Sequence, residues 1–428
     1  MVRSAPYWWE GNPPQSIEGG PVAPHCDVAI VGGGYTGLSA ALTLARAGRS
    51  VQVFDKSRPG EGASTRNGGI ASGNLRLSFA EMISRFGLDR AQALQAEAKA
   101  AREDLAAFLS AEQLACDYSM TGRFSGASSP DQYDKLASEA DLLAKHLGIE
   151  AYAVPRHEQR SALGTDYYWG GMVRMDIGGL DPARLHSGML QIAQRAGATV
   201  LGGTAVRGIS RNGDGTFRVD TEGGPTRARD VIIGTNGYTD AADPWLRRRL
   251  VPVASSIITT APLSPNLMAT LMPRRFMCVE TRKLHYYYRP SPDGTRILFG
   301  GRGASLQEHQ DRVTSRLRQA LVDIFPELSE TPVTHSWSGN VAMNRDLIPR
   351  IFSRDGMHYA AGYCGSGVVW ARWAGQKVAW QVLGDERGRS ALDFRPPPAI
   401  PLYNGNPWFM PAVLAWYEMQ DRIARRRR

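Results

Sequence analysis

The most regular pattern of apolar positions lies at residues 25–56, where two apolar runs flank a glycine turn and a helical stretch. HCDVAIVG has the composition of a buried strand, GGYTGLSAALTLARAG has helical periodicity up to Gly48, and RSVQVFDK is a second strand. This order of strand, tight turn, helix and strand is a βαβ unit. The pattern therefore predicts the first part of a parallel sheet.

Helical periodicity returns at 79–115, 129–147 and 308–324, and in LDPARLHSGMLQIAQRAGATVL, where a proline stands just inside the helix start. DVIIGTNGY and MHYAAGYCGSGVVWARWAGQKVAWQVLG each contain a strand that runs into a glycine turn. Residues 249–301 differ, because their apolar runs have the spacing of a hairpin. This segment predicts an antiparallel sheet.

We therefore expect a mixed α/β and α+β fold, in which a dinucleotide-binding domain is assembled from separated pieces and a substrate domain is inserted between them. No internal repeat occurs. The ranges expected for the nucleotide-binding domain are 20–80, 160–240 and 335–395, those for the substrate domain are 81–159 and 241–334, and a C-terminal tail helix takes 396–428.

Composition narrows the class of protein. With 428 residues the chain is longer than one hydrophobic core usually spans, so we expect more than one domain. Its composition, 43% hydrophobic and 21% charged, is typical of a soluble globular protein. The net charge is +9, yet no stripe of interleaved basic and aromatic residues occurs, so we do not expect nucleic-acid binding. The four cysteines lie too far apart for a zinc site, and no apolar stretch could span a bilayer. We expect a cytoplasmic protein with reduced thiols and no metal.

The first glycine turn has the spacing of a dinucleotide site. Gly32 permits the tight turn, Gly34 lets the backbone approach a pyrophosphate, and Gly37 allows helix and strand to pack closely. The phosphates would lie at the helix N-terminus, where N–H groups favour negative charge. Asp55 ends the next strand and can accept hydrogen bonds from a ribose diol. The Gly- and Ser-rich stretch that follows favours an embedded flavin over an exchangeable nicotinamide, and a turn that merely packs is the alternative.

Several ordered motifs extend this hypothesis. They are GGGYTGLSAALTLARAG, GASTRNGG, YWGGMVRMDIGGLDPARL, DVIIGTNGYT, YYYRPSPDGTRILFGGR, WSGNVAMNRDLIPRI and HYAAGYCGSGVVWARWAGQKVA. With them the chain resembles the D-amino acid oxidase-like FAD-dependent oxidoreductases, in the group of glycine and sarcosine oxidases, and most of all the gamma-glutamylputrescine oxidase branch. The resemblance covers about residues 7–395. It implies a resident FAD in a glutathione-reductase-type, Rossmann-like FAD-binding domain with an inserted antiparallel-sheet substrate domain.

The resemblance also implies which residues hold the cofactor. The stretch after Asp55 would line the flavin or its diphosphate, Val206 and Gly237 would face the adenosine half, and the glycine turn at 362–367 would lie beside the isoalloxazine ring. The complete set is Gly32, Gly34, Tyr35, Thr36, Gly37, Asp55, Lys56, Ser64, Thr65, Arg66, Asn67, Gly68, Gly69, Val206, Gly237, Gly339, Gly365, Ser366, Gly367 and Val368.

The predicted hairpin supplies the candidate substrate residues. A two-residue turn at Asp293 and Gly294 places four polar side chains on one face of the hairpin and the core-like Tyr286, Tyr288 and Phe299 on the other. The polar face, which would orient a substrate above the flavin, consists of His285, Tyr287, Arg289 and Arg302. The second glycine turn adds Ser366. The candidate catalytic residues are therefore Tyr287, Arg302, His285 and Ser366. The alternative is aromatic packing beside solvated arginines.

Departures from the related enzymes bear on the substrate. The carboxylate-binding arginine of D-amino acid oxidases and glycine oxidase is replaced by Asn340 or Val341, and the sarcosine oxidases' lysine and histidine are Val369 and Ser366. Because a carboxylate without a partner costs about 2 kcal/mol or more, we expect an amine substrate unless an arginine of the hairpin, Arg302 or Arg289, binds a carboxylate. Some sarcosine oxidases link their flavin to a cysteine near the segment that corresponds to WSGNVAMNRD, and this chain has none there. The resemblance therefore implies non-covalent FAD.

We expect FAD-dependent oxidation of the C–N bond of a polyamine or N-alkyl amine by hydride transfer, followed by hydrolysis of the imine. Two alternatives stay open, an amino-acid or imino-acid dehydrogenase that passes electrons to a quinone, and a non-catalytic flavoprotein. The expected partners are a small amine and oxygen or another electron acceptor. FMPAVLAWYEMQDRIARRRR has one apolar side and a basic end, so this tail packs on its own domain or makes weak contact with a membrane surface.

Overall fold

The computed structural model describes residues 2–17, 20–302 and 309–426. Its first sheet contains β1 (His25–Val31), β2 (Val51–Phe54), β8 (Thr199–Leu201), β11 (Gly224–Ile233), β17 (Arg350–Arg354) and β18 (Met357–Ala361), with β9 (Val206–Arg211) and β10 (Phe217–Thr221) as an antiparallel extension of β11. The strand order is β17-β18-β11-β1-β2-β8, and β1 pairs in parallel with both β2 and β11. This arrangement confirms the expected parallel α/β unit.

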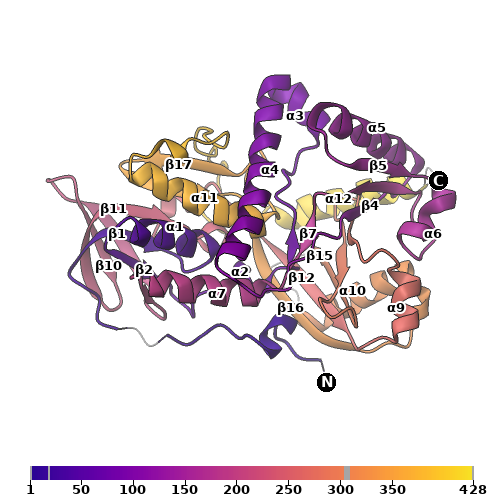
Figure 1. Ribbon diagram of the computed structural model, residues 1–428, viewed down its shortest axis with the longest axis horizontal. Helices are drawn as coiled ribbons and strands as arrows, with labels where there is room; N and C mark the ends of the chain where they lie inside the picture. The colour runs from indigo at the N-terminus through magenta and orange to yellow at the C-terminus, as the bar shows by residue number, and fades with distance from the viewer. Residues whose placement is uncertain (1, 18–19, 303–308, 427–428) are drawn as a thin grey trace.

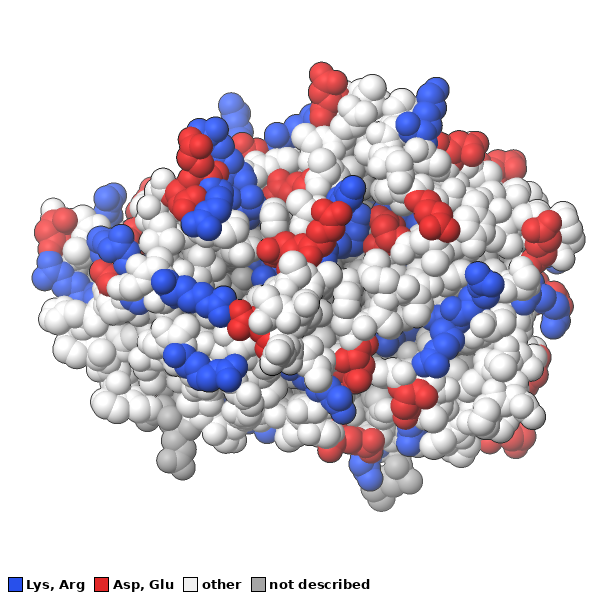
Figure 2. Space-filling model, in the orientation of Figure 1, with Lys and Arg blue, Asp and Glu red and all other residues white. Residues whose placement is uncertain are grey.

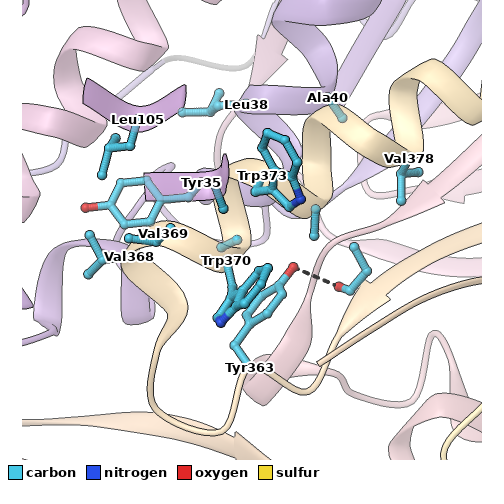
Figure 3. Packing of buried hydrophobic residues seen from close by; sticks show 14 of the residues in the cluster. Tyr35, Leu38, Ala40, Leu105, Tyr363, Val368, Val369, Trp370, Trp373 and Val378 are labelled. Carbon is cyan, nitrogen blue, oxygen red and sulfur yellow. Dashed lines mark hydrogen bonds between the residues drawn. The ribbon is translucent and has the colours of Figure 1, made fainter. Parts of the chain in front are cut away.

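Three helices accompany the first sheet, α1 (Tyr35–Arg46), α7 (Pro182–Arg195) and α11 (Gly367–Val382). Helix α1 packs against both of the others. The approach to α11 is close because Gly375 has no side chain, and a Cβ there would lie 2.2 Å from the carbonyl oxygen of Thr36. Figure 3 shows Leu38 of α1 in the same buried cluster as Trp370 and Trp373 of α11.

The second sheet contains β4 (Arg123–Gly126), β5 (Ala151–Val154), β6 (Gly171–Arg174), β12 (Val251–Thr260), β13 (Met277–Glu280), β14 (Tyr287–Pro290), β15 (Ile297–Arg302) and β16 (Val333–Met343). Their order is β16-β12-β15-β14-β13-β4-β6-β5, and every pair is antiparallel except β13 with β4. In Figure 1 the first sheet occupies the left part of the molecule and the second sheet the right part. The expected antiparallel layer is thus present.

The other helices are α2 (Ala63–Arg66), α3 (Phe79–Phe86), α4 (Leu88–Ala111), α5 (Pro130–Leu147), α6 (Gln159–Ala162), α8 (Pro244–Arg247), α9 (Pro265–Leu271), α10 (Gln310–Ile324) and α12 (Met410–Arg426), and a small sheet pairs β3 (Ile70–Ala71) with β7 (Gly178–Gly179). The helical pattern predicted over 79–115 is divided at Gly87, whose φ of +82° ends α3 and starts α4. Helix α10 packs against β12, β15 and β16.

The hairpin of β14 and β15 has the predicted register, with Tyr287 opposite Gly300 and Tyr288 opposite Phe299. The predicted two-residue turn is wrong. Ser291 N–H donates to the Arg296 carbonyl, and the Gly294 N–H donates back to the Ser291 carbonyl, so the loop comprises residues 292–295. The longer loop leaves the pairing unchanged because it is symmetric about the same centre.

Two strands cross the expected domain ranges. Strand β6 lies within 160–240 and most of β16 lies within 335–395, yet both pair in the second sheet. Strand β6 pairs with β4 and β5, and β16 pairs with β12. The division of the chain into domains therefore stays a prediction in its boundaries.

The surface carries charges of both signs. On the face in Figure 2, Lys and Arg side chains are interspersed with Asp and Glu side chains. Within the described residues, no helix is both long enough and apolar enough to cross a bilayer.

Candidate active site

A cavity of about 1230 Å³ lies where the two sheets meet. Its lining runs from the first glycine turn and the end of β2 to the second glycine turn and the hairpin of the second sheet. Ligand pockets usually measure roughly 300–1,000 Å³. The volume is therefore large enough for a long cofactor together with a second, smaller molecule.

The first glycine turn has a backbone that only glycine allows at two positions. Gly32 has a φ of +106°, and a Cβ at Gly37 would lie 1.9 Å from the carbonyl oxygen of Gly32. Gly34 caps α1 without a side-chain hydrogen bond, and its own missing Cβ would lie 2.8 Å from Ser64 Oγ. The positive end of α1 therefore faces the cavity, where Ser64 Oγ accepts one of its N–H groups, that of Tyr35, at 3.1 Å.

Asp55 and Lys56 line the cavity just after β2. One oxygen of the Asp55 carboxylate accepts from Gly33 N–H at 2.8 Å and the other from Ser57 N–H at 2.9 Å. Burial raises the pKa of Asp55, and these two N–H groups oppose that shift. Since a carboxylate offers about four lone-pair positions, acceptor capacity is left for a ligand. Lys56 Nζ instead pairs with Asp240 at 2.7 Å.

The N-terminal aromatic residues fix the segment around α2 by hydrogen bonds. Trp8 Nε1 donates to the Asn67 carbonyl at 2.8 Å, and Trp9 Nε1 donates to Thr65 Oγ1 at 2.9 Å. The Arg66 guanidinium lies over the Trp9 ring, 4.6 Å from its centroid. Residues 6–9, PYWW, therefore fix the loop of the predicted cofactor site. The sequence alone did not indicate this role.

The second glycine turn leads into α11. Gly362 and Gly365 have φ values of +79° and +107°, and Ser366 caps α11 without a side-chain hydrogen bond to the helix. Gly365 has open space where a Cβ would be. Cys364 also lines the cavity, and burial raises its pKa to about 11, so its thiol stays protonated. A second helix N-terminus is therefore directed at the cavity.

Most of the predicted cofactor residues line this one cavity. Gly37, Thr65 and Gly69 do not. Gly37 packs on the turn, Thr65 Oγ1 donates to the Gly60 carbonyl, and Gly69 lies against the Leu180 carbonyl oxygen, 2.3 Å from a hypothetical Cβ. The residues that line the cavity are Gly32, Gly34, Tyr35, Thr36, Asp55, Lys56, Ser64, Arg66, Asn67, Gly68, Val206, Gly237, Gly339, Gly365, Ser366, Gly367 and Val368.

The candidate catalytic residues Tyr287, Arg302, His285 and Ser366 also line the cavity. The Tyr287 ring lies against Gly300 and near Gly68, because a Cβ at these positions would lie 2.3 Å and 3.1 Å from ring atoms. Tyr287 Oη shares a hydrogen bond of 2.8 Å with Ser255 Oγ. The hairpin of the second sheet is thereby joined to the loop of the predicted cofactor site.

His285 is neutral at physiological pH. Burial, then the charges of Arg302 and Arg76, hold its pKa well below the usual range for histidine. Its buried Nδ1 has no hydrogen-bond partner among the described residues. It therefore lies in the cavity wall as an uncharged ring beside two cations.

Arg302 and Arg76 are two of the cations that line the cavity, and a third, Arg123, also acts on His285. Within the described residues, neither guanidinium makes a hydrogen bond or an ion pair to another side chain, and burial followed by the charge of Arg76 lowers the pKa of Arg302 to about 10. Arg289, expected on the same polar face, is different. Its guanidinium donates to the Gly69 and Leu180 carbonyls and is enclosed by protein, so its proposed contact with substrate is wrong.

The residues of this cavity that the sequence did not indicate include Arg76, Ser255 and Tyr417. Arg76 follows β3 in a stretch with no motif. Tyr417 belongs to α12, whose apolar side was recognised without showing what it covers. Ser255 stands in β12 opposite Arg302, a pairing that only the strand register reveals.

Comparison with known proteins identifies the class. The model of the DAO family, described as FAD dependent oxidoreductase, matches residues 27–381. The chain belongs to the DAO family of FAD-dependent oxidoreductases. It is 31% identical to a probable oxidoreductase OrdL from Rhizobium meliloti over 97% of each chain, and 30% identical to gamma-glutamylputrescine oxidoreductase from Escherichia coli over 93% of each chain. Glycine oxidase from Geobacillus kaustophilus has a similar structure, with a TM-score of 0.73 at 21% identity over 89% of this chain and 99% of that chain.

FAD is thus the cofactor of this DAO family member, and the residues present fit it. FAD has an anionic diphosphate between an adenosine and a flavin ring, and the N-termini of α1 and α11 both line the cavity without a side-chain hydrogen bond from their N-cap residues. When bound, FAD supplies a two-electron acceptor for hydride. The resemblance to the family, the fold class and the FAD-dependent activity predicted from sequence are confirmed.

Proposed function

We propose that this chain oxidises the C–N bond of an amine that also carries an anionic group. The substrate would lose a proton from nitrogen and a hydride from the neighbouring carbon, with FAD as the two-electron acceptor, and hydrolysis of the resulting imine would give a carbonyl compound and an amine or ammonia. The observation that carries the proposal is the Arg76 and Arg302 pair at the cavity, close to Tyr287 and the second glycine turn.

Two guanidiniums in one cavity favour an anionic ligand. A hydrogen bond to a charged group contributes about 1.5–3 kcal/mol, so a carboxylate between Arg76 and Arg302 would be bound well without the arginine that D-amino acid oxidases use. A polyamine is disfavoured, because a second ammonium about 5 Å from a guanidinium is repelled by about 3 kcal/mol at an effective dielectric constant of about 20. One relative is named for glycine, which combines an amine with a carboxylate.

The same charges assist the loss of the amine proton. An ammonium cannot give up a hydride until it is deprotonated, and nearby cations lower the pKa of an amine. Arg76, Arg302 and the neutral His285 form such surroundings, and no acid or base residue is then required. Tyr287, fixed by Ser255, orients the substrate from the hairpin side.

The arginine pair suits a second candidate as well. An amino-acid or imino-acid dehydrogenase that passes electrons to a quinone would need the same carboxylate contact. The two candidates differ in what reoxidises the flavin. Rapid recovery of the yellow colour with a soluble quinone but not with oxygen selects the dehydrogenase.

The test is anaerobic mixing of the FAD-loaded protein with straight-chain ω-amino acids, from glycine upward, and with their methyl esters. Each pair differs only in the carboxylate. We expect at least one acid to bleach the flavin, with a rate at low concentration about tenfold or more above that of its ester. If no amine in the panel bleaches the flavin, the proposed oxidation is wrong. If an ester reacts as fast as its acid, the oxidation stands and the anionic group is wrong.

A further inference from the structure

The C-terminal helix α12 (Met410–Arg426) lies outside the 27–381 that the family model matches. It nevertheless reaches the cavity, since Tyr417 is one of the lining residues. Figure 1 shows this helix in yellow, running beside the second sheet towards the C-terminus. The position of Tyr417 gives the helix a part in the site.

The start of α12 is anchored on one side of the second sheet. Tyr403 is 2% exposed, lies in a buried cluster with Val251 and Val253 of β12, and donates its hydroxyl to the Leu250 carbonyl at 2.8 Å. Met410, the first residue of α12, packs against the same cluster. The helix therefore starts over β12.

The other end of α12 is attached to the connection between β13 and β14. The Asp421 carboxylate accepts from Lys283 N–H at 2.9 Å and from Leu284 N–H at 3.2 Å. This connection is itself fixed, because Glu280 pairs with Arg282 at 2.7 Å. His285, which lines the cavity, directly follows Leu284 in the chain.

The two anchors lie at opposite ends of the strand run β12-β15-β14-β13. From Met410 to Asp421 the helix rises about 16 Å at 1.5 Å per residue, enough to cross the roughly 14 Å of three strand spacings. Arg302 ends β15 within this interval. The inner side of the helix carries Leu414 and Tyr417, whereas Trp416 is 54% exposed.

We propose that α12 is the outer wall of the substrate pocket, that Tyr417 contacts the substrate beside Arg76 and Arg302, and that Asp421 holds the helix closed. The inference rests on the proposed function for the identity of the occupant. Tyr417 is then a residue that determines which substrates fit. The phenol can donate a hydrogen bond to the anionic group that the two arginines hold, and it limits the length of chain behind that group.

Tyr417 and its neighbour Trp416 form a matched pair of variants. Both are aromatic residues in the same helix turn, one facing the cavity and the other facing out. With the ω-amino acid that bleaches the wild-type flavin fastest, we expect Tyr417→Ala to raise KM about tenfold and to change kcat by less than about twofold. Tyr417→Phe should show most of that rise, and Trp416→Ala almost none. Equal KM values for Tyr417→Ala and Trp416→Ala would overturn the contact.

The closing role of Asp421 has a test that needs only bound FAD. Acrylamide, a neutral quencher, should reach the flavin at least about threefold more readily in Asp421→Ala than in wild type, whereas Glu418→Ala, an exposed change on the same helix, should match wild type. Equal quenching in the two variants would overturn the closing role. Because this measurement uses no amine, it decides the role of α12 even if no amine bleaches the flavin.

Discussion

Replacing Gly37 with alanine tests whether the first glycine turn holds FAD. The added Cβ would lie 1.9 Å from the Gly32 carbonyl oxygen and 3.2 Å from Ile30 Cγ2. Since a carbon needs about 3.5 Å from such a neighbour, α1 must move away from the turn by more than about 1 Å. Overpacking of this kind costs about 1–3 kcal/mol. The turn and the start of α1 move apart, and these are the two elements that would bind the diphosphate.

A displacement worth 2 kcal/mol weakens FAD binding by about 30-fold. The assay is titration of the apoprotein with FAD, followed by flavin fluorescence, beside thermal unfolding of the same samples. Gly208→Ala is the matched control, because a Cβ there has no atom within 4 Å. We expect the control to bind FAD as wild type does. Wild-type affinity in Gly37→Ala would refute the reasoning that the close approach of α1 to this turn matters for FAD.

Three further predictions follow from buried contacts. His186 has its pKa lowered to about 4, chiefly by burial, while its ring donates to the Gly33 carbonyl, so the unfolded state binds more protons between pH 6.5 and pH 4. Stability should therefore fall by up to about 3 kcal/mol as pH drops through that window, and His186→Gln, followed by urea unfolding, should flatten the dependence. If the stability of His186→Gln falls with pH as steeply as that of wild type, the role of His186 is contradicted. Trp8→Ala, which removes a side chain only 2% exposed, should cost about 3–5 kcal/mol of stability and lower FAD affinity, whereas Trp408→Ala, 61% exposed in wild type, should do neither. Acid precipitation should leave FAD in the supernatant, since the Cys364 thiol, whose pKa burial raises to about 11, stays protonated. A yellow pellet contradicts non-covalent binding.

The parts of the fold that the sequence predicted well are local. The glycine spacing from Gly32 to Gly37 predicted the first turn, and the alternation of side chains along β14 predicted which of Tyr287 and Tyr288 faces the cavity. Each depends on residues close together in the chain, so composition and period are sufficient. The loop of the same hairpin was predicted too short, because the last backbone hydrogen bond across the hairpin joins Ser291 N–H to the Arg296 carbonyl and leaves residues 292–295 in the loop, with the register unchanged.

The parts that the sequence did not predict depend on contacts between distant segments. Arg289 and Arg302 share a face of the hairpin, yet Arg289 meets the Gly69 and Leu180 carbonyls and is buried, while Arg302 stays in the cavity. The partner of Arg302 in the cavity, Arg76, comes from a segment more than two hundred residues earlier. Strand β6 likewise belongs to the second sheet through pairing with β4. No local sequence pattern encodes these contacts between distant segments.

The central claim is that Arg302 binds an anionic group on an amine while FAD takes the hydride. Four single-turnover rates of anaerobic flavin reduction test it directly, for wild type and Arg302→Ala, each with the best ω-amino acid and with its methyl ester. We predict that the acid reacts at least about tenfold faster than the ester in wild type, and that this ratio falls close to one in the variant. The account is contradicted if the ratio of acid to ester is the same in both proteins.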